Sequence, residues 1–384
     1  MKNAKSFQEP RQPKLVDTTL RDGEQTAGVV FSIDEKLEIA GMLSKAGVYQ
    51  IEAGVPAMKA DEIEAIRAIV KANLKCSIMG WCRAVASDVE DAISCGLDAV
   101  CVSISSSDIH IKHKLQKTRK QVLDMLRRTI NFAKSNGLYV SANAEDASRT
   151  DMHQLIEFAQ VAKDAGADRL RFCDTVGILN PIQTYVRIKM LIDKIRLPVE
   201  IHAHNDFGMA TANALAGFEA GAQFLSVTIN GLGERAGNAA LEEVVMALKY
   251  TTNYKVKFDT SLIKGLSDLV VKASGRDVGL NKPIVGKNIF FHEVGTQVKS
   301  VLTSPNTYEA FAPGEVGAQR QIIIGKHSGR SAVIIKFQEY GVTVDKEEAS
   351  AIICEVKKKA AAVKRALFDK ELMDIYYKAI KGKK

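Results

Sequence analysis

The feature that most constrains the fold of this chain is a regular alternation of two segment types. Between residues 14 and 250, short apolar runs rich in β-branched residues alternate with longer segments of helical periodicity, and the pair recurs eight times. Strands that alternate with helices form parallel sheets. Eight such units fit a closed (β/α)8 barrel better than an open doubly wound sheet, because no GxGxxG motif follows the first strand. We therefore predict an α/β fold, a TIM barrel.

The alternation also gives approximate bounds for each element. The predicted strands are 14–17, 49–55, 75–81, 98–104, 138–144, 169–175, 199–205 and 224–230. The predicted helices of the same region include 34–47, 59–72, 118–135, 150–165, 181–195, 208–220 and 239–250. Polar residues cluster where several of these strands end, and barrel enzymes carry their active groups at that end.

Beyond the barrel the alternation stops. Helical periodicity returns near 258–275 and 346–378, and the stretch of about 280–330 is irregular. We predict a catalytic barrel domain over residues 1–255. A linker with smaller, mainly helical subdomains is predicted over residues 256–384.

Composition excludes several classes of protein. The chain is 46% hydrophobic and 26% charged, as in ordinary globular proteins. It has no run near the ~20 apolar residues of a membrane helix and no signal-peptide core, so we expect a cytoplasmic protein without membrane contact. The net charge is +8, but acids and bases are interleaved, which argues against nucleic acid as a partner. The basic segment 112–128 indicates solvated helix faces or a seat for a phosphorylated cofactor. The six cysteines form no CxxC pair, which argues against disulfides and structural zinc.

Two histidines at the end of the seventh strand indicate a metal. His202 and His204 in HAHND are two residues apart, so their side chains point to the same side of a strand. A single histidine is more often a hydrogen-bonded core residue, but paired imidazoles indicate a metal that uses their lone pairs. Asp22, after the first strand, adds a carboxylate, and the set suits Mn²⁺, Zn²⁺, Mg²⁺ or Fe²⁺. Asn238 in GLGERAGN is a weaker fourth candidate.

Other polar residues at the same end suit the chemistry of a 2-oxo acid. Such an acid can chelate the metal through its ketone and carboxylate oxygens, which polarises the carbonyl. Arg21 would then stabilise charge on an enolate or alkoxide, and a salt bridge to Asp17 or Glu24 is its structural alternative. Glu145 is a candidate base or base-orienter, and the Thr175 hydroxyl is a candidate ligand of the substrate carboxylate.

These segments resemble those of a known family. LVDTTLRDGEQ, AEDASRTD, FCDTVG, HAHNDFGMATAN and NGLGERAGNAALEEVV are similar to signature segments of the isopropylmalate synthase and homocitrate synthase family of barrel acyltransferases, over roughly 14–340. The resemblance implies a Claisen-type condensation of acetyl-CoA with a 2-oxo acid, followed by thioester hydrolysis. It implies a divalent metal and a homodimer. The residue roles implied are metal binding by Asp22, His202 and His204 near Asn238, oxyanion contact by Arg21, carboxylate binding by Thr175 and proton transfer by Glu145.

The resemblance also bears on the acceptor. The length, GWCR, IVGKNIFFHE and GKHSG are similar to homocitrate synthases of the nitrogen-fixation type, so we expect 2-oxoglutarate as acceptor. SDIHIKHKL, with His110, is closer to the isopropylmalate synthases, and an isopropylmalate, citramalate or citrate-type reaction is the alternative. Ser141 stands where many lysine-pathway homocitrate synthases carry an arginine for the distal carboxylate. His110, Ser141 and Asn143 complete the expected substrate contacts.

One position departs from the family pattern. The family segment HE-x-G-I-H ends in a histidine, proposed to act with a downstream tyrosine in proton transfer, often across a dimer interface. Here the segment ends in Gln297, while Tyr308 matches the tyrosine. Glutamine cannot titrate, so it can orient a water or a thioester oxygen but cannot shuttle a proton. A catalytically impaired 2-oxo acid-binding paralogue is therefore one alternative. An iron oxygenase is another, disfavoured because its ligands would come from the first and seventh strands of a parallel barrel.

Overall fold

The chain forms two compact units. The computed structural model describes residues 11–380 and residue 382. The first unit runs through Val278 and the second begins at Gly279. The division lies beyond the predicted boundary at residue 255 because helix α10 (Ile263–Ser274) packs against α1 (Ile33–Ala46) of the barrel.

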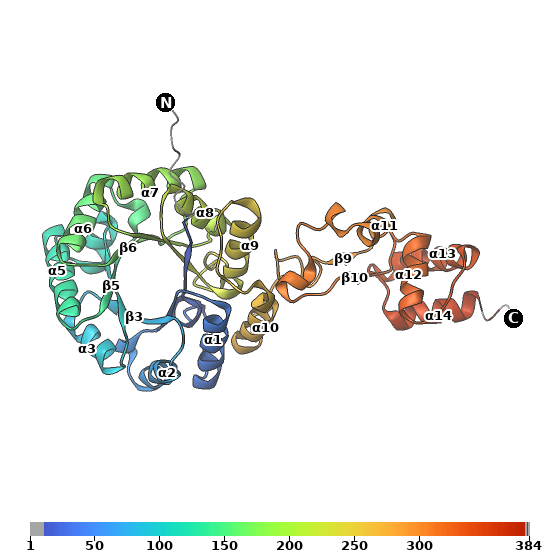
Figure 1. Cartoon of the computed structure of the whole chain (residues 1–384), viewed down its shortest axis with the longest axis horizontal. Coiled ribbons are helices and arrows are strands. Elements are labelled where there is room, and N and C mark those ends of the chain that lie inside the picture. The colour runs from blue at the N-terminus through green and yellow to red at the C-terminus, as the bar shows by residue number, and fades with distance from the viewer. Residues whose placement is uncertain (1–10, 381, 383–384) are drawn as a thin grey trace, which may run out of the picture. The chain divides into compact units, whose positions relative to one another are not determined.

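The first unit is a closed barrel of eight parallel strands surrounded by helices (Figure 1), which confirms the predicted fold class. The strands are β1 (Lys14–Asp17), β2 (Gln50–Gly54), β3 (Ser77–Arg83), β4 (Ala99–Ser105), β5 (Tyr139–Glu145), β6 (Arg169–Asp174), β7 (Val199–Ala203) and β8 (Phe224–Val227). The remaining helices are α2 (Ala60–Lys71), α3 (Ala86–Ser94), α4 (Asp108–His110), α5 (Arg119–Ser135), α6 (Met152–Asp164), α7 (Pro181–Ile195), α8 (Ala210–Ala220) and α9 (Leu241–Thr251). Strand β1 closes the barrel against β8, with Lys14 opposite Phe224.

Local sequence sets the start of several barrel helices. Ser32, Thr118 and Asn180 each cap a helix and form a reciprocal capping box with the residue three positions later. Such boxes satisfy backbone N–H groups that a helix start leaves without partners. Each cap therefore fixes where a loop ends and the next helix begins.

Apolar and aromatic side chains fill part of the barrel interior. Val16, Met79, Cys101 and Phe224 form a buried cluster. The guanidinium of Arg169 lies over the Phe224 ring, 4.5 Å from its centroid. The interior therefore combines apolar packing with buried charge, and the charged part lies under the site described below.

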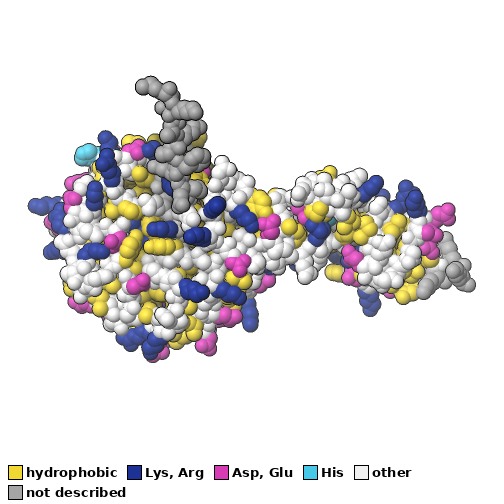
Figure 2. Space-filling model, in the orientation of Figure 1, with side chains coloured by type: hydrophobic (Ala, Val, Ile, Leu, Met, Phe, Trp, Pro, Cys, Tyr) yellow, Lys and Arg dark blue, Asp and Glu magenta, His cyan; other side chains and the backbone are white. Residues whose placement is uncertain are grey.

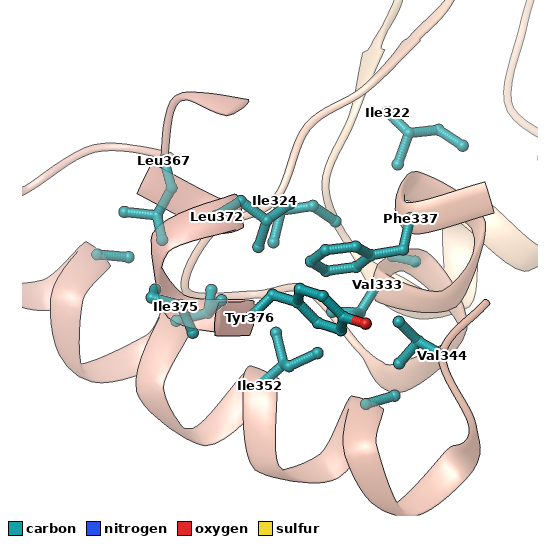
Figure 3. Packing of buried hydrophobic residues seen from close by; sticks show 14 of the residues in the cluster. Ile322, Ile324, Val333, Phe337, Val344, Ile352, Leu367, Leu372, Ile375 and Tyr376 are labelled. Atoms are coloured by element: carbon teal, nitrogen blue, oxygen red, sulfur yellow. The ribbon is translucent and has the colours of Figure 1, made fainter. Parts of the chain in front are cut away.

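The second unit is mainly helical and contains a short parallel pair, β9 (Phe291–His292) and β10 (Gln321–Ile322). Its helices are α11 (Gly295–Thr303), α12 (Arg330–Glu339), α13 (Lys346–Val363) and α14 (Asp369–Ala379). Figure 3 shows their core, in which Phe337 packs against Tyr376. The prediction of one helix over 346–378 is wrong. The chain breaks at Lys364, which has a φ of +53°, and Leu367 then bridges to Ile324.

The surface carries charges of both signs. Figure 2 shows Lys and Arg side chains interspersed with Asp and Glu on the face in view. Among the described residues, none of the helices has the length and apolar character needed to cross a membrane.

Candidate active site

A tight turn after β1 places two functional side chains next to each other. The carbonyl oxygen of Thr18 accepts hydrogen bonds from the backbone N–H groups of Arg21, Asp22 and Gly23, at 3.1, 2.9 and 3.1 Å. These bonds wind residues 19–23 into a single π-helical turn. Arg21 and Asp22 are thereby fixed at the carboxyl end of the barrel, and Asp22 is 1% exposed.

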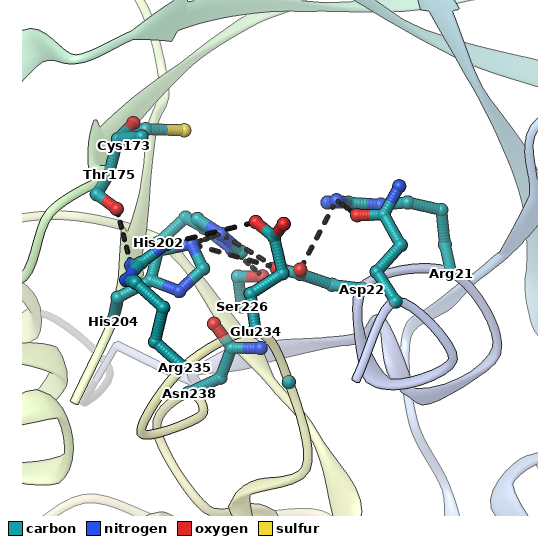
Figure 4. A network of polar contacts seen from close by, with 12 residues as sticks. Arg21, Asp22, Cys173, Thr175, His202, His204, Ser226, Glu234, Arg235 and Asn238 are labelled. Carbon is teal, nitrogen blue, oxygen red and sulfur yellow. Dashed lines mark hydrogen bonds and ion pairs between the residues drawn. The ribbon is translucent and has the colours of Figure 1, made fainter. Parts of the chain in front are cut away.

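The two histidines converge on Asp22, as Figure 4 shows. The Nε2 atoms of His202 and His204 are 3.3 Å apart, and they lie 3.1 and 3.9 Å from Asp22 Oδ2. His202 Nδ1 is 2.8 Å from Ser226 Oγ. If Nδ1 donates that bond, the Nε2 lone pair is free to bind a metal. Two imidazole nitrogens and one carboxylate oxygen thus face one point.

Electrostatics keep two of these residues, Asp22 and His204, in the protonation states that bind a metal. Burial by itself would raise the pKa of Asp22, but the nearby Arg21 guanidinium and the imidazoles outweigh it, and the pKa lies well below its usual range. Burial, together with the neighbouring His202, lowers the pKa of His204 to about 4. An ionised carboxylate and a neutral imidazole are the forms that ligate divalent metals, so these residues fit a metal ion.

Asn238 offers a further oxygen close to the histidines. It forms an isolated bridge with His204, and Figure 4 shows both in the same cluster. Its Nδ2 donates to the carbonyl of Leu232 at 3.2 Å, whereas its Oδ1 is buried without a hydrogen-bond partner among the described residues. A buried acceptor without a partner is costly, and a metal or a bound water would satisfy it.

Arg21 is held by a partner that sequence reasoning did not foresee. Its Nε donates to Glu52 Oε2 at 2.7 Å, and its Nη1 lies 3.3 Å from Gln25 Oε1 and 3.5 Å from Asp22 Oδ1. The expected structural alternative, a salt bridge to Asp17 or Glu24, does not form. Asp17 accepts from the backbone of Thr19, and Glu24 pairs with Lys36 at 2.6 Å.

A cavity of about 220 Å³ joins these groups at the barrel mouth. Its walls contain seven of the predicted site residues, namely Arg21, Asp22, Asn143, Glu145, Thr175, His202 and His204. Sequence reasoning missed further lining residues, which are Gln25, Trp81, Ser103, Lys114, Cys173 and Glu234. Trp81, Ser103 and Cys173 lie near the carboxyl ends of their strands, and strand parity was the signal that would have found them.

Glu145 is the centre of a polar group at the cavity edge. Its carboxylate lies 2.5 Å from Lys114 Nζ, accepts from Ser105 Oγ at 2.8 Å, and lies 3.4 Å from His110 Nδ1. His110 Nε2 is 3.2 Å from Arg149 Nη2. Because a guanidinium only donates, His110 Nε2 accepts this bond, which leaves the proton of a neutral imidazole on Nδ1, towards Glu145. His110 thus contacts Glu145 rather than lining the cavity itself.

The other predicted contacts occupy different surroundings. Asn143 Nδ2 donates to Ser103 Oγ at 2.7 Å, and Cys173 Sγ lies 2.6 Å from Asn143 Oδ1. The Thr175 hydroxyl accepts from the backbone of Asp146 at 2.9 Å, which leaves its proton available. Ser141 is fully buried inside the barrel, where it accepts from Arg169 Nε at 3.1 Å, and it does not line the cavity.

Two predicted catalytic residues belong to the second unit. Gln297 lies in the first turn of α11. Tyr308 follows a short 3-10 turn and is 54% exposed. Their roles in catalysis stay predictions.

The fold and this rim of ligands define a class of barrel enzymes, and comparisons identify the family. Residues 12–270 match the HMGL-like family, and residues 284–364 match the homocitrate synthase post-HMGL domain-like family. The chain therefore belongs to the family of homocitrate and isopropylmalate synthases, and it is an acyltransferase of that family.

Curated relatives agree with this assignment, and a solved structure agrees with the fold. The chain is 58% identical to 2-isopropylmalate synthase 2 of Caldanaerobacter subterraneus subsp. tengcongensis, over 98% of this chain and 99% of that protein. It is 46% identical to homocitrate synthase 1 of Nostoc sp., over 94% of this chain and 95% of the relative. The crystal structure of the Bacillus subtilis HMG-CoA lyase, at 21% identity, superposes with a TM-score of 0.64 over 70% of this chain and 96% of that one, which shows a shared fold.

Proposed function

We propose that this enzyme joins the acetyl group of acetyl-CoA to the ketone carbon of a 2-oxo acid and releases CoA. The observation that carries the proposal is the convergence of Asp22, His202 and His204 next to Arg21 in one buried cavity. A metal-binding triad beside a fixed cation suits a reaction in which a carbonyl oxygen becomes negatively charged.

The residues present fit a divalent ion such as Mn²⁺, Mg²⁺ or Zn²⁺. Asp22, His202 and His204 would hold it, and the unpartnered Oδ1 of Asn238 would contribute directly or through a water. When bound, such an ion supplies Lewis-acid polarisation of the acceptor ketone.

Side chains of the chain itself orient the acceptor. The Arg21 guanidinium donates to the oxygen that gains charge, and the Thr175 hydroxyl, whose proton is available, donates to the acceptor carboxylate. The wall formed by the neighbouring strands β3, β4 and β5 contains Trp81, Ser103 and Asn143. This wall contacts the part of the acceptor that differs between 2-oxo acids.

A second cavity, of about 410 Å³, offers room for the pantetheine end of acetyl-CoA. Arg21 and Gln25 line both cavities, so the two adjoin at the reacting end. Val29, Phe31 and Met58 give the second cavity an apolar lining, which suits a long, uncharged pantetheine arm. The thioester would then enter the site beside Arg21.

Proton transfer is assigned to Glu145. The carboxylate takes a proton from the acetyl methyl group, and the resulting carbanion attacks the ketone carbon. The alkoxide formed there takes the proton back and becomes the hydroxyl of the product. Water then adds to the thioester carbonyl, the C–S bond breaks, and CoA leaves as the thiol. Lys114 and Ser105 donate to Glu145 and hold its carboxylate at the cavity edge. Gln297 would orient a water or the thioester oxygen.

Two acceptors are supported by different observations. The neutral wall formed by Trp81, Ser103 and Asn143, together with the relative named 2-isopropylmalate synthase 2, supports a branched aliphatic 2-oxo acid, 2-oxoisovalerate. The relative named homocitrate synthase 1 supports 2-oxoglutarate, for which Lys114 at the cavity is a candidate counter-ion of the distal carboxylate.

An acceptor panel tests the proposal. Purified protein with Mn²⁺ and acetyl-CoA is incubated with 2-oxoisovalerate, 2-oxoglutarate, pyruvate or oxaloacetate, and free thiol and product mass are measured. We expect thiol release and a product whose acid form is heavier than that of the acceptor by one acetic acid. Absence of thiol release with every acceptor would contradict the proposal. If binding of a 2-oxo acid accompanies that absence, and Gln297→His starts turnover, the impaired-paralogue alternative is supported instead.

A further inference from the structure

A buried ladder of alternating charges lies beneath the site. In this ladder, Glu52 lies between Arg21 and Arg171, with nitrogen–oxygen distances of 2.7 and 2.9 Å. Glu200 lies between Arg171 and Arg169, with nitrogen–oxygen distances of 2.7 Å to each. These residues come from the loop after β1 and from strands β2, β6 and β7. Arg21 side-chain exposure is 9%, and the other four side chains are fully buried. Arg21 is thus the member of the ladder that lines the cavity.

The Glu52 carboxylate divides its two oxygens between two guanidinium groups. Oε2 accepts from Arg21 Nε and Oε1 accepts from Arg171 Nη1. A bond at Nε fixes the plane of a guanidinium, because Nε is the atom at which the group joins its flexible stem. Arg21 Nη1 is then on the cavity side, near Gln25 and Asp22 at the longer distances of 3.3 and 3.5 Å.

We propose that Glu52 is a positioning residue for the condensation: it holds the Arg21 guanidinium in the orientation that meets the charged oxygen of the acceptor, and it acts only through Arg21. The inference rests on the proposed function. Without Glu52, Arg21 would keep only its longer contacts and would pair with the Asp22 carboxylate that the metal needs.

A purely structural ion pair is the competing explanation, and Glu200 provides the matched control. Both glutamates are fully buried, and both bridge two arginines in the same ladder. Glu200 contacts Arg169 and Arg171 but not Arg21. A structural role predicts equal effects at both positions, whereas a positioning role predicts a catalytic effect at Glu52 alone.

The glutamine variants separate these explanations. In Glu52→Gln the side-chain amide has only one oxygen, which can accept from either Arg21 or Arg171. The NH₂ group that replaces the other oxygen cannot accept from a guanidinium, so one of the two arginines loses its hydrogen bond. We expect kcat to fall about 10- to 100-fold, with little change in the KM for acetyl-CoA. Glu200→Gln should lower the melting temperature at least as much but keep kcat within about two-fold of wild type. Equal losses of kcat in the two variants would overturn the proposal.

A rescue experiment tests whether Glu52 acts on kcat through Arg21. In Glu52→Gln with Arg171→Met, the competing guanidinium is absent, so the glutamine oxygen can turn to Arg21 Nε. The double variant also carries the same net charge as wild type, because one acid and one base are removed. We expect kcat to recover at least about five-fold over Glu52→Gln. A double variant no more active than Glu52→Gln would contradict action through Arg21.

A binding measurement keeps this inference separate from the proposed function. Titration calorimetry with 2-oxoglutarate and 2-oxoisovalerate, in the presence of Mn²⁺, reports acceptor affinity without turnover. We expect Glu52→Gln to weaken acceptor binding about ten-fold relative to Glu200→Gln, with Mn²⁺ affinity within about two-fold. If wild type binds an acceptor but releases no thiol, the proposed function fails while this comparison still decides on Glu52. Equal acceptor affinities in the two variants, or no acceptor binding by wild type, would overturn the positioning role.

Discussion

Among single residues, we expect Asp22 to contribute most to the candidate metal centre, because it is the one carboxylate among the candidate ligands. Its carboxylate faces both imidazole nitrogens and is almost fully buried. Asn in its place would retain an oxygen but lose the charge, which supplies most of the attraction for a divalent ion.

We therefore predict that Asp22→Asn weakens Mn²⁺ binding at least about ten-fold, measured by titration calorimetry. Asp206→Asn is the matched control, since Asp206 lies two residues beyond His204 and pairs with Arg235 at 2.8 Å. That variant should bind Mn²⁺ as wild type does. Equal Mn²⁺ affinities for Asp22→Asn and wild type would show that the ion, if bound, lies elsewhere.

Asp17, below the site, gives a prediction about pH. Burial raises its pKa to about 7, although it accepts a hydrogen bond from the Thr19 backbone. Its folded-state pKa lies above the unfolded value of 3.8, so its contribution to stability is present below pH 3.8 and is lost as the pH rises to 7. This loss amounts to at most about 1.4 kcal/mol for each pH unit.

Asp17→Asn removes this titration and keeps an oxygen for Thr19. The free energy of unfolding of the variant, relative to wild type, should rise between pH 4 and pH 7 and then level off. Urea unfolding at a series of pH values measures it. A difference that stays constant over that range would contradict the burial argument.

Among the elements, the loop after β8 shows how backbone geometry supports the site. Gly237 precedes Asn238 and has a φ of +88°, and a Cβ there would lie 2.0 Å from the carbonyl oxygen of Gly231. An alanine would therefore force the loop to move. Gly275, at the end of α10, has a similar φ of +63° but open space around its Cβ position.

We predict that Gly237→Ala weakens Mn²⁺ binding severalfold by displacing Asn238, whereas Gly275→Ala costs about 1 kcal/mol of stability and leaves Mn²⁺ binding unchanged. Calorimetry and thermal unfolding of both variants measure these effects. If the two variants bind Mn²⁺ equally well, Asn238 does not contribute to the metal centre.

At this scale, sequence periodicity located the strands well but could not reveal which interior positions carry charge. Glu52 lies in an apolar run, YQIEAGV, and Arg169 and Arg171 lie in RLRFCDT, so alternation gave no reason to place them in contact. Their pairing depends on the barrel bringing β2 and β6 face to face across its interior, at a sequence separation of 119 residues. Asp22, His202 and His204 could be predicted because each lies in a short motif next to a strand end. Asp22 lies in DTTLRDGEQ, and the two histidines lie in HAHND.

For the whole molecule, the break between α13 and α14 was not visible in sequence. Helix-forming residues continue on both sides of Lys364, so the sequence shows no break there. The turn depends on the bridge between Leu367 and Ile324, two residues that are far apart in the sequence. The family resemblance predicts a homodimer, with Gln297 and Tyr308 acting at the site of a partner subunit, and this can be tested on the whole molecule.

Complementation between two inactive variants tests whether two subunits share a site. Tyr308→Phe and Asp22→Asn should each be nearly inactive, and mixing the two after subunit exchange should restore up to about a quarter of wild-type activity, because half of the dimers are mixed and each has one intact site. Light scattering before and after mixing gives the oligomeric state. A monomer in solution, or a mixture no more active than its components, would contradict a shared site.

The metal dependence of thiol release tests the proposed chemistry at the Asp22, His202 and His204 cluster most directly. Protein freed of metal by a chelator is titrated with Mn²⁺ in the presence of acetyl-CoA and the best acceptor, in parallel with His202→Gln. We expect turnover to be lost without metal, to return with about one Mn²⁺ per chain, and not to return in the variant. Equal thiol release by chelated protein, or by His202→Gln, would contradict it.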